Sequence, residues 1–181
     1  MSKLILDLLR NGGYILYSRH GEATVEEDQP NLDLQNCSTQ RNLSELGRRQ
    51  AIYYGQMIHN LNIPINYPVL ASPLCRSVET AQLAFGQTNV QIDNFWFNVY
   101  RLSENLPDAE QQKILNTLQS RLEVIPLSGY NKVIIAHGFL KGIGLGEIPN
   151  MGTVVIRPRG QGNGYEIVRE LSLIDLANFD K

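Results

Sequence analysis

The sequence predicts a single α/β domain in which a mostly parallel β-sheet is flanked by helices. Apolar runs of strand length alternate with segments of helical periodicity, an order typical of parallel sheets with helices on both faces. The chain of 181 residues is long enough for one well-packed domain and too short for two ordinary ones. We therefore assign residues 1–181 to one three-layer domain that ends in a pair of strands.

The composition is that of a soluble globular protein, with 43% hydrophobic and 19% charged residues. The net charge of −2 leaves no basic excess for binding nucleic acid or a membrane surface. No apolar run is long enough to cross a bilayer. Residues 4–10 are interrupted by Asp7 and lack a cleavage site, so they predict a short amphipathic helix on the domain edge. We expect a cytoplasmic protein with no nucleic-acid or membrane partner.

The two cysteines, Cys37 and Cys75, are too few for a disulfide framework or a zinc site. Without an export signal, reduced thiols are expected. Both cysteines lie in segments that are assigned below to one site, so a single bridge between them is the alternative.

The first predicted strand, residues 13–18, ends at Arg19-His20-Gly21-Glu22. Ligands of open α/β sheets bind at such strand ends. Residues 22–42 are polar and aperiodic, which indicates either a binding loop or a mobile surface insertion. Ser44 then predicts the N-cap of an amphipathic helix over residues 45–60.

A second short strand, Val69–Ala71, is followed by Ser72 and Pro73. Serine at the cap and proline at the first helical position predict a helix that ends at Gly86. Arg76 falls in the first turn of this helix, off its apolar stripe. A guanidinium beside the free N–H groups of a helix start favours an anion.

The C-terminal half contains the clearest buried strand of the chain, residues 132–136, which stops at His137-Gly138. The glycines that follow disfavour a helix over residues 142–146. The other predicted elements are a strand at 90–92, a helix at 107–125 with Ile125 on its apolar face, and a terminal strand pair at 153–156 and 165–168.

These elements are expected to bring Arg19, His20, Arg76 and His137 to one edge of the sheet. Two arginines and two histidines would form a compact cationic pocket. Its natural ligand is a dianionic phosphoryl group, which planar guanidinium groups grip with paired hydrogen bonds.

The motifs in this order resemble the histidine phosphatase superfamily, the phosphoglycerate-mutase-like family, over about residues 12–145. Three further features are similar to a small, poorly characterised phosphatase subgroup of that family. The superfamily motifs are Arg19-His20-Gly21, Leu43-Ser44…Gly47…Gln50-Ala51, Ser72-Pro73…Arg76…Glu79-Thr80-Ala81 and the late His137. The subgroup features are the run from Cys37 to Leu43, the pair Cys75-Arg76 and the run from Val155 to Pro158.

The resemblance implies a metal-independent phosphomonoesterase that needs no cofactor and acts on a phosphorylated small molecule or phosphoprotein. His20 would be the nucleophile and form a phosphohistidine. Arg19, Arg76 and His137 would bind the equatorial oxygens and stabilise the transition state. The backbone of Gly21 would orient the ring of His20, and the nearby arginines would lower the pKa of that ring.

The general acid is less well defined by the sequence. Glu104 is the first candidate, and Glu22, which we also place in substrate binding, is the second. A loop acid such as Asp28, or no dedicated acid, is the alternative. Arg41 is expected to be a solvated loop residue, with a position in the pocket as the alternative.

Two alternative functions stay open. A phosphohistidine protein phosphatase needs little proton donation, because phosphohistidine is a good leaving group. A catalytically silent phosphate-binding module would keep the pocket without turnover. A mutase is disfavoured, since neither its acid nor its longer insertions can be placed.

Overall fold

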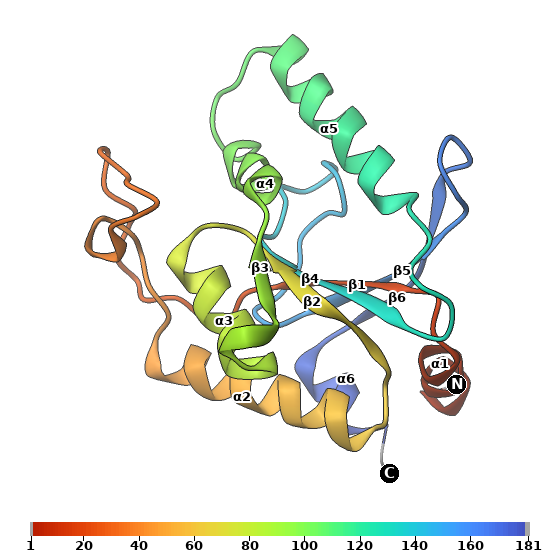
Figure 1. Ribbon diagram of the computed structural model, residues 1–181. Helices are drawn as coiled ribbons and strands as arrows, with labels where there is room; N and C mark the ends of the chain where they lie inside the picture. Colours follow the sequence, from red (N-terminus) through yellow and green to blue (C-terminus); the bar gives the residue numbers. More distant parts are fainter. Residues whose placement is uncertain (1, 180–181) are drawn as a thin grey trace.

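The computed structural model describes residues 2–179, which contain one six-stranded sheet (Figure 1). The strands lie in the order β3-β2-β4-β1-β5-β6. Neighbours among the first four are parallel, whereas β5 is antiparallel to both β1 and β6. The predicted fold class is therefore confirmed. The strands are β1 (Ile15–Arg19), β2 (Ile65–Ala71), β3 (Val90–Ile92), β4 (Asn131–Ala136), β5 (Thr153–Pro158) and β6 (Tyr165–Leu171).

Helices cover both faces of the sheet, because successive side chains of a strand point to opposite sides. Leu16 packs in the core formed with α1, α2, α3 and α6, whereas Ile15 and Tyr17 pack in the core formed with α4 and α5. Figure 1 shows α2, α3 and α6 below the sheet and α4 and α5 above it. The helices are α1 (Ser2–Asn11), α2 (Glu45–Asn60), α3 (Cys75–Phe85), α4 (Phe97–Arg101), α5 (Asp108–Leu122) and α6 (Leu173–Ala177).

The helix predicted over residues 45–60 is confirmed as α2. The Ser44 hydroxyl accepts a hydrogen bond from the Gly47 backbone N–H at 3.0 Å, as expected of an N-cap. Further along, a Cβ at Gly55 would lie 2.0 Å from the Ala84 carbonyl oxygen of α3. The two helices therefore approach more closely than any side chain at this position would allow.

The start of α3 differs from the prediction. The helix begins at Cys75, and no side chain caps it. Ser72 instead continues the sheet, since its N–H donates to the Ile135 carbonyl at 3.0 Å and its hydroxyl lies against His137. The assignment of Ser72 as the cap and Pro73 as the first helical residue was wrong, because strand pairing extends one residue beyond β2.

Two other boundaries also differ. β2 begins at Ile65 rather than Val69, and its pairing with β4 shifts register around Pro68, which has no N–H to donate. α5 ends at Leu122, which leaves Ile125 60% exposed rather than on the apolar face of the helix. The short N-terminal helix is confirmed as α1.

The carboxyl ends of the central strands are level with one another. Arg19 at the end of β1 lies opposite Ala136 at the end of β4. β2 ends beside them, since Ala71 pairs with Ile135. The residues that follow these three strands therefore meet at one edge of the sheet.

Candidate active site

His20 lies directly after β1 and is only 3% exposed. Its backbone N–H donates to the Ala136 carbonyl at 3.0 Å, which continues the pairing with β4. Its ring Nδ1 lies 2.7 Å from the Gly21 carbonyl oxygen. A carbonyl only accepts, so the neutral ring carries its proton on Nδ1 and leaves the Nε2 lone pair available.

The environment of His20 keeps its ring neutral. Burial, followed by the positive charge of Arg76, lowers the pKa of His20 from 6.5 to about 3. The Gly21 carbonyl acts in the opposite direction but does not reverse the effect. A neutral imidazole with a free Nε2 is the form in which histidine acts as a nucleophile.

His137 follows β4 and faces His20, with ring centroids 5.5 Å apart. Its Nε2 lies 2.7 Å from the hydroxyl of Ser72, and its carbonyl accepts a hydrogen bond from the Tyr17 hydroxyl at 2.7 Å. Burial, and then the neighbouring His20 and Arg76, lower the pKa of His137 well below its usual value. Both histidines are thus neutral at physiological pH.

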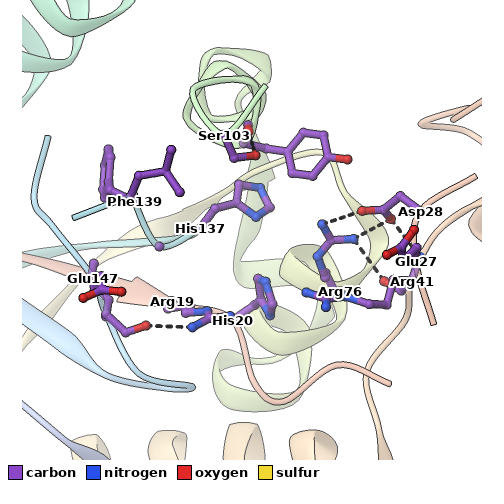
Figure 2. Close-up of a pocket in the computed structure, with 14 residues that line it drawn as sticks. Arg19, His20, Glu27, Asp28, Arg41, Arg76, Ser103, His137, Phe139 and Glu147 are labelled. Atoms are coloured by element: carbon purple, nitrogen blue, oxygen red, sulfur yellow. Dashed lines mark hydrogen bonds and ion pairs between the residues drawn. The ribbon is translucent and has the colours of Figure 1, made fainter. Parts of the chain in front are cut away.

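Three arginines surround the two histidines. Arg19, Arg41 and Arg76 line the same cavity of about 700 Å³ as His20 and His137 (Figure 2). The Nε atom of each arginine is buried and has no hydrogen-bond partner in the described part of the chain. Burial, and then the charges of Arg41 and Arg76, lower the pKa of Arg19. An anion in the cavity would relieve this crowding of positive charge.

The position of Arg41 corrects the expectation that it is solvated. Its side chain lines the cavity. The loop that carries it is tied to α3 by a disulfide between Cys37 and Cys75, with Cα atoms 5.8 Å apart. In addition, the Arg41 backbone N–H donates to Asp28 at 2.8 Å, and its carbonyl accepts from Arg76 at 3.0 Å.

The disulfide contradicts the expectation of reduced thiols and bears out the alternative of a bridge. Its two ends lie in the loop and at the start of α3, next to Arg76. Disulfides persist mainly in oxidising compartments, so this bridge does not favour the predicted cytoplasmic location. Among the described helices, none is long and apolar enough to cross a membrane.

Glu104 and Glu22, the first two candidate acids, do not line the cavity, whereas the alternative candidate Asp28 does. The Glu104 carboxylate is half exposed and lies 4.0 Å from Arg101 Nε. Glu22 accepts a hydrogen bond from the Ser44 hydroxyl at 2.8 Å, at the start of α2. The carboxylates that do line the cavity are Glu27, Asp28 and Glu147.

The Gly21 carbonyl makes the contact with His20 that the predicted orienting role requires, and this position also needs to be glycine. A Cβ at this position would lie 2.5 Å from the Gly47 carbonyl oxygen at the start of α2. Sequence reasoning missed Tyr100 and Phe139, which form cavity walls. Tyr100 lies in a segment without clear periodicity, so no signal marks it in advance.

No described group of three or more His, Cys, Asp and Glu side chains has the arrangement of a metal site. The arrangement of the cavity is instead that of an oxyanion site, in which a neutral imidazole faces cationic donors. Such a site suits phosphoryl transfer to histidine.

Comparisons with known proteins concern the family and the fold. Residues 15–96 match the family model described as the histidine phosphatase superfamily (branch 1). The matched segment contains Arg19, His20, Arg41 and Arg76. The match confirms the predicted resemblance to this superfamily and supports a phosphatase. A search of curated protein sequences finds no significant match.

Solved structures share the fold at low sequence identity. A putative alpha-ribazole-5'-P phosphatase from Escherichia coli K-12 superposes with a TM-score of 0.60 at 14% identity, covering 90% of this chain and 98% of that one. The protein histidine phosphatase SixA complexed with tungstate gives 0.57 at 15% identity, covering 90% and 99%. A phosphoserine phosphatase mutant from Entamoeba histolytica in complex with phosphoserine gives 0.56 at 17% identity, covering 90% and 98%.

Proposed function

We propose that this protein is a metal-independent phosphomonoesterase that forms a phosphohistidine on His20. One observation carries the proposal: three guanidinium groups, whose buried Nε atoms have no partner among the described residues, surround a neutral histidine whose Nδ1 is held by a carbonyl. The arginines provide the positive charge that a metal ion provides in other phosphoryl-transfer sites.

The reaction proceeds in two displacements. In the first, Nε2 of His20 attacks phosphorus, the bond from phosphorus to the leaving oxygen breaks, and that oxygen keeps the electron pair and takes a proton from solvent. In the second, water attacks phosphorus and gives up a proton to solvent, the N–P bond breaks, and inorganic phosphate leaves with neutral His20 restored. Arg19, Arg41, Arg76 and His137 bind the non-bridging oxygens in both steps and stabilise their charge.

The carboxylates available to protonate the leaving group favour one refinement of this function. Glu104 and Glu22 have other partners, while Glu27 and Glu147 lie at the exposed rim of the cavity. The largely buried carboxylate of Asp28 is paired with Arg76. A site with this arrangement is best suited to leaving groups that need little protonation. Phosphohistidine in a protein is such a substrate, and the fold shared with SixA, a protein histidine phosphatase, supports it as the second candidate.

The test is hydrolysis of an aryl phosphate in the presence of a metal chelator, followed by a phosphohistidine peptide and phosphoserine. His20→Ala should lower kcat/KM by at least about 1,000-fold, because it removes the nucleophile. His59→Ala is the matched control, since His59 is an exposed histidine at the end of α2.

Two results would reject the proposal. If wild type and His20→Ala hydrolyse all three substrates equally, His20 is not the nucleophile. If wild type binds inorganic phosphate but turns over none of the three substrates, the protein is a phosphate-binding module instead.

A further inference from the structure

Asp28 in the loop between β1 and α2 forms a paired ion contact with Arg76. Its Oδ1 lies 2.9 Å from Nη1 of Arg76 and its Oδ2 lies 3.2 Å from Nη2 (Figure 2). Both side chains are largely removed from solvent, with 2% of Arg76 and 12% of Asp28 exposed. The pair is therefore shielded from the solvent screening that weakens surface ion pairs.

The contact uses only one edge of the guanidinium. The planar guanidinium fork has two edges that can bind a paired acceptor. One N–H group of Nη1 and one of Nη2 form the end of the fork, whereas the Nε hydrogen and the remaining Nη2 hydrogen form its side. Asp28 occupies the end, and the Arg41 carbonyl takes the second Nη1 hydrogen at 3.0 Å. The buried Nε has no partner among the described residues. The side of the fork is thus left for another paired acceptor.

Asp28 is itself held in place by several contacts. Its Oδ1 also accepts from the Arg41 backbone N–H at 2.8 Å. The loop is fixed to α3 by the disulfide of Cys75, whose N–H donates to the Gln40 side chain at 2.8 Å.

These contacts also argue against Asp28 as a proton donor. Burial raises the pKa of Asp28, but the hydrogen bonds from Arg76 and from the Arg41 N–H outweigh burial and hold it below its usual value. An ionised carboxylate that accepts from a guanidinium has no proton to transfer to a leaving group.

We propose that Asp28 is a positioning residue: it holds the end of the Arg76 fork so that the Nε side faces the phosphoryl group of the substrate. The proposal rests on the proposed function and deepens it. Asp28 also reduces the formal charge of the three-arginine cradle from +3 to +2, which matches a phosphoryl dianion.

A double-mutant cycle tests this role. Binding of inorganic phosphate by calorimetry and kcat/KM for an aryl phosphate are measured for wild type, Asp28→Asn, Arg76→Lys and the double variant. Asn places an N–H₂ group against one Nη, so Asp28→Asn should weaken both quantities by about 10- to 100-fold through misplacement of the fork. The lysine ammonium group has no planar guanidinium fork for Asp28 to position. Asp28→Asn should therefore change the Arg76→Lys background by less than about 2-fold.

Two further variants separate positioning from loop structure. Glu26→Gln removes an exposed charge from the same loop and should match wild type. Asp28→Glu keeps the carboxylate at a different reach and should lie between wild type and Asp28→Asn. It also replaces Asp28→Asn in the cycle if the latter fails to fold by circular dichroism.

Several outcomes would overturn the proposal. Tighter phosphate binding by Asp28→Asn would make Asp28 a competitor of the substrate. Equal losses of phosphate affinity and of kcat/KM in the wild-type and Arg76→Lys backgrounds would assign Asp28 a structural role. Loss of only the alkaline limb of the pH–rate profile would assign Asp28 a role in proton transfer. Because phosphate binding needs no turnover, this cycle remains decisive even if the phosphatase reaction itself is absent.

Discussion

Acidification should destabilise the folded protein through His20. Burial and the charge of Arg76 lower the pKa of His20 from 6.5 to about 3 in the folded chain. Below pH 6.5 the unfolded chain therefore binds more protons than the folded chain, so the free energy of unfolding falls as the pH falls towards 3. Between pH 7.5 and 5, His20 alone should lower the free energy of unfolding by about 2 kcal/mol. His137 should add a loss of the same sign, because its pKa is also lowered.

Urea denaturation followed by the fluorescence of buried Trp96, the single tryptophan, measures this loss. The change between the two pH values should be about 2 kcal/mol smaller in His20→Ala than in wild type. His59→Ala should keep the wild-type change, and comparing changes removes any offset in the variants' stability at neutral pH. Equal changes in wild type and His20→Ala would refute the inference that His20 is held neutral by burial.

Two further predictions concern the disulfide and Ser72. The Cys37–Cys75 bridge joins residues 38 apart, and its reduction should lower the free energy of unfolding, measured by urea denaturation, by about 4 kcal/mol. The Cys37→Ser/Cys75→Ser variant should no longer respond to reductant. An unchanged urea midpoint on reduction of the wild-type protein would contradict the bridge. Ser72→Ala removes the hydroxyl partner of His137 and should lower kcat/KM for an aryl phosphate by about 5- to 10-fold. Ser77→Ala is the control, because the buried Ser77 hydroxyl has no partner within residues 2–179. Equal effects of the two variants would refute a role for the Ser72 contact.

The sheet edge and its main residues were predictable because simple local signals place them. The strands before His20 and His137 are short apolar runs, and the carboxyl ends of parallel strands meet at one edge. The structure brings both histidines to the same cavity as Arg19 and Arg76. The positions of Arg19, His20 and His137 follow from strand direction, and that of Arg76 from the helix that follows β2.

The loop residues were not predictable, because long-range contacts determine their positions. Arg41 and Asp28 lie in an aperiodic segment, and the contact from Asp28 to Arg76 spans 48 residues. At Ser72 a local rule conflicts with a long-range contact: the cap rule favours a helix start, but pairing with β4 continues through this residue. Glu104 illustrates a similar limit, since the turn after α4 directs it towards Arg101 and solvent.

The central claim is that His20 carries the phosphoryl group during turnover. Rapid quenching of the wild-type protein with a ³²P-labelled substrate, followed by peptide mapping, tests it most directly. We predict an acid-labile, base-stable phosphate on His20 that forms as fast as turnover and is absent from His20→Ala. Turnover without a labelled protein, or a label on another residue, would contradict the claim.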